Sequence, residues 1–417
     1  MTGTILLLAT LAGFDFGADL RIRQEIMQNV PQANSGEAGG YRNQMRYRPR
    51  VWGEAFGDAG DAGKWRFKAR LVDEFRWNVH PYSAKTAWPG EVIFDNLFIE
   101  GKGIDDGFMD VRIGRQDLYN YCGLNHVFMD GTPGDGSRTV YSDMASVRFN
   151  VDEESALDIF GLYNLDSNHD FRWGDETRRQ TGLTARYSDG DGDQDDWGYG
   201  VIWGSKLAPD FSYQVFAMQK QMKEPGLRER DHTELVGVKL APRWNETLTS
   251  SFEVMSELDC EWSAYADIGW KSADEGIRPF LKAGYHYMSE RWDPMWARAV
   301  NDSEKFLYGS HDGTAWWSNM HYVKLTGGVE FGRHHALTAS TGPMFTAKND
   351  GVGGGDGDFK GELSQLKYEF PLITADKAKG GRFEIFGHAL VEMFNPGGYW
   401  ATEKTAWFVR WQIELTF

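Results

Sequence analysis

Residues 405–417 read Thr-Ala-Trp-Phe-Val-Arg-Trp-Gln-Ile-Glu-Leu-Thr-Phe, and this stretch decides the fold. From residue 407 onward, one set of alternating positions is wholly apolar: Trp407, Val409, Trp411, Ile413, Leu415 and Phe417. The intervening set is mainly polar: Phe408, Arg410, Gln412, Glu414 and Thr416. Because successive side chains of a strand point to opposite sides, the stretch predicts a strand with one apolar and one polar face. A lipid-facing apolar side, a polar inner side and aromatic residues at the interfaces are typical of outer-membrane barrel strands.

The composition agrees with a barrel. The chain has 417 residues, of which 41% are hydrophobic, and a mean hydropathy of -0.52. It contains no run of about 18 apolar residues, so the sequence offers no transmembrane helix. A barrel can cross a membrane with this composition, because only alternate residues face lipid. The net charge of -17 argues against nucleic acid as a partner.

Similar alternation recurs along the chain, with Gly-rich and Asp-rich turns between the segments. About nineteen segments have this character, and bacterial barrels normally have an even number of strands. We therefore predict an all-β transmembrane antiparallel barrel of about eighteen strands, with short periplasmic turns and longer extracellular loops. The surplus segment is expected within residues 155–260, a region that includes the candidate strand Arg178–Tyr187. The segment Arg291–Asn319 is expected to be an extracellular loop.

The N-terminal region contains a short apolar run, Ile5–Leu11, followed by Ala12 and Gly13. This resembles the core of a secretory signal, although no Lys or Arg precedes Arg21. We predict a signal-peptide remnant at residues 1–13 and a single barrel domain at residues 14–417. A disulfide between Cys122 and Cys260 is left open, because sequence alone does not supply the geometry.

Basic residues gather on one face of neighbouring candidate strands. Arg46, Arg48 and Arg50 share one face, and Arg66, Lys68 and Arg70 share a face of the next segment. Directly opposed like charges repel, so these residues require a wet lumen with interleaved acids such as Glu25, Glu54 and Glu74. Two compatible interpretations remain open: an ion-pair network that stiffens the wall, and a surface that selects anions.

The segment Leu118–Arg138 is a long loop that is rich in Gly and Pro. It contains Asp130-Gly-Thr-Pro-Gly-Asp-Gly-Ser-Arg138, which indicates tight turns rather than a flexible linker. We predict that the loop folds back into the mouth of the barrel and narrows the pore.

Four motifs occur in order: Arg-x-Arg-Pro-Arg-Val within 41–51, Asp-Asn-Leu-Phe-Ile at 95–99, Arg-Ile-Gly-Arg-Gln-Asp at 112–117 and the segment from Asp130 to Thr139. This order resembles the alginate export family of outer-membrane porins over residues 41–149. The resemblance implies a bacterial outer-membrane barrel of about eighteen strands with a basic lumen for an anionic polysaccharide. The residues at its motif positions are Arg46, Arg48, Arg50, Arg112, Arg115, Asp117, Asp130 and Arg138. With Arg66, Lys68 and Arg70 they form the predicted lumen site.

The predicted function is a channel that passes an anionic poly- or oligosaccharide, alginate-like, or other organic anions. The alternatives are a barrel enzyme such as a lipid hydrolase and a general porin without substrate preference. Neither His-Glu-x-x-His nor Gly-x-Ser-x-Gly occurs, so we expect no enzyme and no catalytic residues. The expected partners are outer-membrane lipid and an anionic carbohydrate or organic anion; a periplasmic partner is left unidentified.

One acidic segment has some character of a calcium loop, with carboxylates at alternate positions: Asp189, Asp191 and Asp193. The segment lacks Gly at the sixth position, and Gly200 stands where a bidentate Glu would be needed. An acidic solvated loop is therefore the preferred interpretation, and we expect no cofactor.

Overall fold

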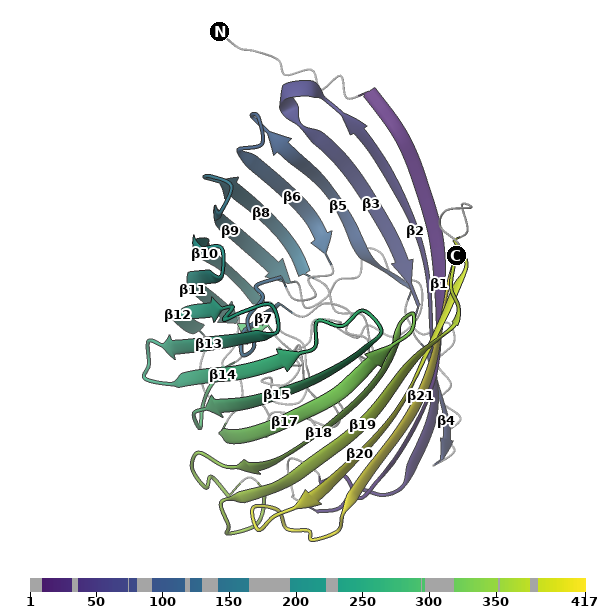
Figure 1. Cartoon of the computed structure of the whole chain (residues 1–417), viewed down its shortest axis with the longest axis vertical. Helices are drawn as coiled ribbons and strands as arrows, with labels where there is room; N and C mark the ends of the chain where they lie inside the picture. The colour runs from purple at the N-terminus through teal and green to yellow at the C-terminus, as the bar shows by residue number, and fades with distance from the viewer. Residues whose placement is uncertain are drawn as a thin grey trace.

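The protein is a closed antiparallel β-barrel in a computed structural model (Figure 1). The structure describes residues 10–31, 37–73, 75–80, 92–116, 121–129, 142–164, 196–222, 232–293, 295–296, 319–351, 353–375 and 382–417. The first strand, β1 (Thr10–Gln28), pairs on one side with β2 (Arg42–Asp58) and on the other with β21 (Ala406–Thr416). The pairing of the first and last strands leaves no open edge and closes the barrel.

The remaining wall strands follow in chain order, each antiparallel to its neighbours. They are β3 (Lys64–Val72), β4 (Phe75–His80), β5 (Ile93–Ile104), β6 (Met109–Gln116), β8 (Ser142–Asn150), β9 (Ser155–Asn164), β10 (Asp196–Ala208), β11 (Phe211–Met222), β12 (His232–Pro242), β13 (Leu248–Glu257), β14 (Trp262–Lys271), β15 (Ile277–Met288), β17 (Met320–Phe331), β18 (His335–Phe345), β19 (Phe359–Ile373) and β20 (Glu384–Pro396). Both β3 and β4 pair with β2, so they are two parts of one wall strand. The 19 segments of the sheet therefore make the predicted eighteen-strand wall.

Two predicted boundaries can be compared with this wall. Asn164 at the end of β9 pairs with Asp196 at the start of β10, and the candidate strand at 178–187 lies outside the described residues. Residues 1–9 also lie outside them. The expected signal-peptide boundary at residue 13 falls inside β1, where Thr10 pairs with Asp58.

The outer surface of the barrel is apolar, as the closing strand predicts. On β21 the side chain of Val409 is 40% exposed, whereas its neighbour Arg410 is 5% exposed and faces inward. Other wall strands also expose large apolar side chains, including Phe14 and Phe16 on β1 and Val201 on β10. An apolar exterior is the surface that a barrel needs in lipid.

The connections between wall strands range from short turns to long segments. Short turns such as Gly332–His334 join β17 to β18, where Gly332 has a φ of 55°. A glycine adopts this left-handed backbone without steric cost. Among the described residues, no helix has the length and apolarity that a membrane crossing would need. Their one helical element is the 3-10 turn η1 (Gly60–Ala62) between β2 and β3.

Two further strand segments lie inside the ring of wall strands rather than in it. They are β7 (Phe128–Met129), which is labelled in Figure 1, and β16 (Met295–Trp296), which pairs with it in parallel. Around them a single apolar cluster includes Leu124, Trp292 and inward-facing methionines such as Met288 and Met344. Methionine suits this position because its unbranched, flexible side chain fills irregular gaps. The interior is thus partly filled by chain that belongs to the loops.

Candidate lumen site

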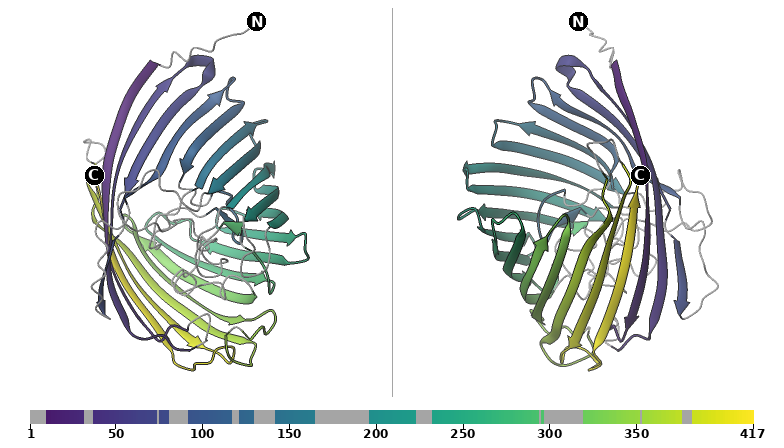
Figure 2. Two further views of the ribbon diagram at one scale, coloured as in Figure 1. Left: turned by 180° about the vertical axis from the view of Figure 1, so that it is seen from behind. Right: turned by 45° about the vertical axis from the view of Figure 1, so that its right-hand side comes forward.

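An arginine patch lines the inner face of three neighbouring strands, β21, β1 and β2. Figure 2 shows these strands side by side in its right-hand view. The patch consists of Arg21, Arg23, Arg46, Arg48, Arg50 and Arg410. The register sets two pairs directly opposite each other, Arg21 with Arg48 and Arg23 with Arg46. Like charges in directly opposed positions destabilise a sheet unless acids neutralise them, so the acids nearby determine whether this patch is stable.

Glu25 on β1 is the central acid of the patch. Its carboxylate lies 3.1 Å from Arg23 Nη1, 3.1 Å from Arg46 Nη1 and 4.0 Å from Arg410 Nη1. The Gln44 Nε2 group also donates to Glu25 Oε2 at 2.6 Å. One buried carboxylate thus interacts with guanidinium groups from three strands.

Two further carboxylates complete the patch. Arg50 donates from Nε to Asp19 Oδ1 at 2.7 Å, and its Nη2 lies 3.4 Å from Glu414 Oε1. Arg48 Nη2 lies 3.7 Å from the same Glu414 oxygen. A neutral acceptor contributes as well, because Arg23 donates from Nε and Nη2 to Gln412 Oε1 at 2.9 and 2.6 Å.

The patch carries more positive than negative charge. Within residues 19–25, 46–50 and 410–414 it holds six guanidiniums, whereas the carboxylates are those of Asp19, Glu25 and Glu414. Arginine keeps its charge at any working pH. Within these three stretches, guanidiniums therefore outnumber carboxylates, although the whole chain has a net charge of -17.

A second group of cations continues toward the short-turn end of the barrel on β3 and β6. Lys68 Nζ lies 2.6 Å from Glu54 Oε1, Arg70 donates to Asp95 at 2.7 and 2.8 Å, and Arg66 Nη2 lies 2.8 Å from Glu100 Oε2. Arg112 also pairs with Glu100. The side chains of Arg66, Lys68 and Arg112 are 32%, 21% and 29% exposed, so they are accessible from the lumen.

An aromatic ring separates two of these cations. The guanidinium carbons of Arg66 and Arg112 lie 5.3 and 5.0 Å from the centroid of the Phe98 ring. Both distances allow a cation–π interaction, which holds the two guanidiniums apart while Glu100 bridges them. The predicted interleaving of acids is therefore correct for Glu25 and Glu54, whereas Glu74 lies outside the described residues.

The structure describes only some of the other predicted site residues. Arg115 on β6 makes a bidentate pair with Asp143 on β8, at 2.8 and 2.9 Å. It follows Gly114, whose φ of 126° interrupts the regular alternation of β6. The directions of the Arg112 and Arg115 side chains therefore do not follow from alternation alone. Outside the described residues lie Asp117, Asp130 and Arg138 of the predicted lumen site, and Asp189, Asp191 and Asp193 of the calcium candidate.

The described part of the predicted inward loop, residues 121–129, does lie inside the barrel. Asn125 donates from its backbone N and from Nδ2 to the Glu253 carboxylate on β13, both at 2.8 Å. Lys239 on β12 donates to the Gly123 carbonyl oxygen and lies 3.0 Å from Glu253 Oε1. His126 Nε2 lies 2.9 Å from His286 Nδ1 on β15. For this segment, the prediction that the loop folds inward is confirmed.

The segment predicted as an extracellular loop, 291–319, begins inside the barrel, and its membrane side stays a prediction. Trp292 and Met295 are fully buried in the apolar cluster inside the barrel, and Asp293 is also buried. Trp292 Nε1 donates to the His126 carbonyl oxygen at 3.3 Å. The apolar side chains at 292 and 295 account for this position, because packing in the lumen removes them from water.

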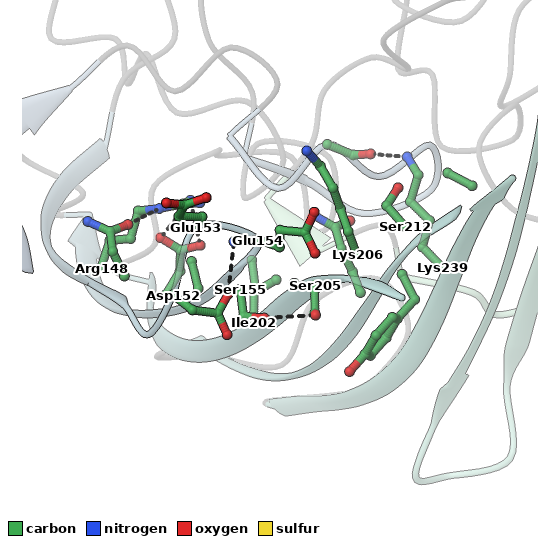
Figure 3. Close-up of a pocket in the computed structure, with 18 residues that line it drawn as sticks. Arg148, Asp152, Glu153, Glu154, Ser155, Ile202, Ser205, Lys206, Ser212 and Lys239 are labelled. Carbon is green, nitrogen blue, oxygen red and sulfur yellow. Dashed lines mark hydrogen bonds and ion pairs between the residues drawn. The ribbon is translucent and has the colours of Figure 1, made fainter. Parts of the chain in front are cut away.

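A pocket lies between the 121–129 segment and the wall strands β8 to β12, near the short-turn end (Figure 3). Its volume is about 420 Å³. Asp152, Glu153 and Glu154 line it from the turn between β8 and β9, and Lys206 and Lys239 line it from β10 and β12. The pocket lining has four acids and three bases, so its balance of charge is opposite to that counted in the arginine patch.

Both cysteines are free, Cys122 in the inner loop segment and Cys260 on the surface. In the described part of the chain, no three His, Cys, Asp or Glu side chains are grouped so that they could hold a metal ion. Burial raises the pKa of Tyr121, next to Cys122, to about 12, so this phenol stays neutral.

The predicted lumen site left out three members of the arginine patch: Arg21, Arg23 and Arg410. Each occupies a polar position in a strand with period-2 alternation, and that signal was present in the sequence. What was missing was the pairing of β1 with β21, which sets Arg410 opposite Glu25.

Comparison with solved structures supports the fold. The Pseudomonas aeruginosa protein OccK5 (OpdH) superimposes with a TM-score of 0.59 at 10% identity, over 97% of this chain and 98% of that one. The outer membrane protein OprD from Pseudomonas aeruginosa gives 0.57 at 8% identity, over 98% and 96%. A BenF-like porin from Pseudomonas fluorescens Pf-5 gives 0.58 at 9% identity, over 97% and 100%.

Sequence comparison adds no relative. Neither a protein-family model nor a curated protein sequence matches the chain. The resemblance to the alginate export family therefore finds no support in these comparisons, whereas the predicted barrel agrees with them. The chain has the fold of the eighteen-strand porins of the bacterial outer membrane.

Proposed function

We propose that this protein is an outer-membrane channel that passes small organic anions along the basic side of its lumen. The observation that carries the proposal is the excess of guanidinium over carboxylate groups in the arginine patch. A confined, low-dielectric wall focuses such a field, so these charges act on a passing anion more strongly than the acidic exterior does.

The accessible cations on β3 and β6 extend this surface. Arg66, Lys68 and Arg112 are partly exposed, and each also interacts with an acid. A cation that already has an acidic partner attracts an anion only moderately. Conduction requires sites of this kind, because a single tight site would retain the ion. Passage of an alginate-like oligosaccharide is the narrower form of the proposal, since its carboxylates would use the same sites.

The test is the reversal potential of single channels in planar bilayers across a salt gradient. The wild-type channel should prefer anions, and the preference should weaken at high salt because screening shortens the reach of the fixed charges. The triple variant Arg48→Gln, Arg50→Gln and Arg112→Gln keeps polar side chains but removes three positive charges. It should lose most of the anion preference.

A matched control removes three exposed cations at the two ends of the barrel: Lys271→Gln, Arg278→Gln and Lys348→Gln. It should change selectivity much less, because these groups lie outside the arginine patch. A wild-type channel that prefers cations, or an Arg48/Arg50/Arg112 triple variant that matches this control, would contradict the proposal. Reversal potentials measured with short oligouronates on one side then test passage of an alginate-like oligosaccharide. The same measurement with monocarboxylates tests passage of small organic anions.

A further inference from the structure

Two loop segments inside the barrel form one unit, which we call the inner loop unit: residues 121–129, and residues 291–293 with 295–296. Phe128–Met129 and Met295–Trp296 pair with each other in parallel. Trp292 adds a side-chain hydrogen bond to the His126 carbonyl oxygen, at 3.3 Å. The buried side chains of Leu124 and Trp292 belong to the same apolar cluster. A force that displaces one segment therefore acts on the other.

One ion pair joins this unit to the wall. Lys220 on β11 donates from Nζ to Asp293 Oδ2 and, at 3.0 Å, to the Met295 carbonyl oxygen. Thr233 Oγ1 on β12 donates to Asp293 Oδ2 at 3.0 Å, and the Asp293 backbone N donates to Glu257 Oε1 on β13 at 2.6 Å. Three adjacent strands thus hold a single aspartate of the loop. Both members of the ion pair are buried.

We propose that the Lys220–Asp293 ion pair is the latch that holds the inner loop unit against β11–β13, and that the latch sets the free cross-section of the lumen. The argument rests on the asymmetry of buried ion pairs. Removal of one partner leaves the other buried charge without this counter-charge, which is more unfavourable than replacing both partners by apolar groups. The first half of the proposal is independent of what the channel transports, and the second half rests on the proposed function.

The chain contains its own reporter for the position of the unit. Cys122 lies in the 121–129 segment with 3% of its surface exposed. Burial also raises the pKa of its thiol, so little of the reactive thiolate is present. Cys260, on the connection between β13 and β14, is exposed and serves as an internal standard in the same molecule. A water-soluble maleimide should therefore label Cys260 quickly and Cys122 slowly.

The experiment measures both labelling rates on the full chain in detergent and in lipid vesicles. In Asp293→Asn and in Lys220→Met, labelling of Cys122 should accelerate by about tenfold or more, because the closed state loses a buried ion pair. The rate at Cys260 should not change. The control is Glu330→Gln, which also removes one paired carboxylate, but from exposed pairs with Lys271 and Arg278 that contact neither loop segment. It should leave both rates unchanged.

A double variant separates a latch from general loosening. Lys220→Met combined with Asp293→Leu removes both charges and should label Cys122 more slowly than either single charge-removing variant. Unchanged Cys122 labelling in both single variants, or equal acceleration in the Glu330→Gln control, would overturn the latch. Single-channel conductance tests the second half: it should rise or fluctuate in the two single variants. Faster labelling at an unchanged conductance would overturn that half, without bearing on anion selectivity.

Discussion

The two sides of the barrel interior use buried charge for different purposes. On β21, β1 and β2, guanidiniums and carboxylates of the wall interact with each other along the strands, as at Glu25. On β11 to β15, wall groups such as Lys220 and Glu253 interact with loop segments inside the lumen. The first side leaves an excess of positive charge, whereas the second immobilises chain. A lumen-facing charge in this protein therefore either pairs within the wall or anchors a loop, and its partners show which.

The largest effect is expected at the centre of the arginine patch. Glu25→Gln removes the carboxylate near Arg23, Arg46 and Arg410, and should lower the free energy of unfolding by about 3–5 kcal/mol because buried guanidiniums lose their counter-charge. Urea unfolding in lipid vesicles measures it. A cost as small as that of an exposed pair would show that water, rather than Glu25, stabilises these arginines.

The second prediction places a cation on the outward face of β21, opposite the face that carries Arg410. Val409 faces outward next to the inward-facing Arg410. Val409→Arg should cost about 2–4 kcal/mol near the membrane midplane, since its charge would face lipid there. The same unfolding assay applies, with Ile413→Arg as a second site. If both variants unfolded like the wild type, the outer face of β21 would not contact lipid.

On the loop-anchoring side, Glu253→Gln weakens the attachment of Asn125 and of Lys239. Hydrogen bonds to a charged group contribute about 1.5–3 kcal/mol each, and a neutral amide retains part of that. We therefore expect a loss of about 1–3 kcal/mol. Current fluctuations in single-channel records should increase, while anion preference changes little. A Glu253→Gln variant that lost anion preference without larger current fluctuations would show that Glu253 serves selectivity rather than attachment of the loop.

The smallest effect is expected at an exposed pair that belongs to neither group. Lys271 and Glu330 lie 2.7 Å apart at the short-turn end of β14 and β17, with side chains 48% and 29% exposed. Glu330→Gln should change stability by less than about 1 kcal/mol, because water screens the pair. A larger change in urea unfolding at moderate salt would mean that exposure is a poor guide to how much an ion pair contributes to stability.

Period-2 alternation predicted much of the wall, and the reason is physical. Lipid on one side and water on the other impose a strict alternation, which Val409 and Arg410 display. The candidate strand at 178–187 was indistinguishable from a wall strand by pattern, because alternation does not report the pairing partner. The direct pairing of β9 with β10 supplies that information.

The candidate site was predictable only where the groups lie on adjacent strands. Glu25 and Glu54 were expected near the basic residues, since neighbouring strands of a hairpin array pair in order. Arg410 and Lys220 escaped prediction because their partners are far away in sequence: Arg410 meets Glu25 across the closing seam, and Lys220 meets Asp293 across 73 residues. No local pattern contains such a pairing.

The seam between β1 and β21 also bears on how the chain assembles. Arg23 donates to Gln412 across 389 residues, and Asp19 to Gln28 of β1 pair with residues 407 to 416 of β21. Contacts between such distant positions form late and slowly, since the whole intervening chain must first be ordered. Until then β1 and β20 present unpaired edges, which are templates for pairing with other chains. Part of the arginine patch therefore becomes complete only when the last strand docks, so the finished barrel and its charged seam arise in a single step.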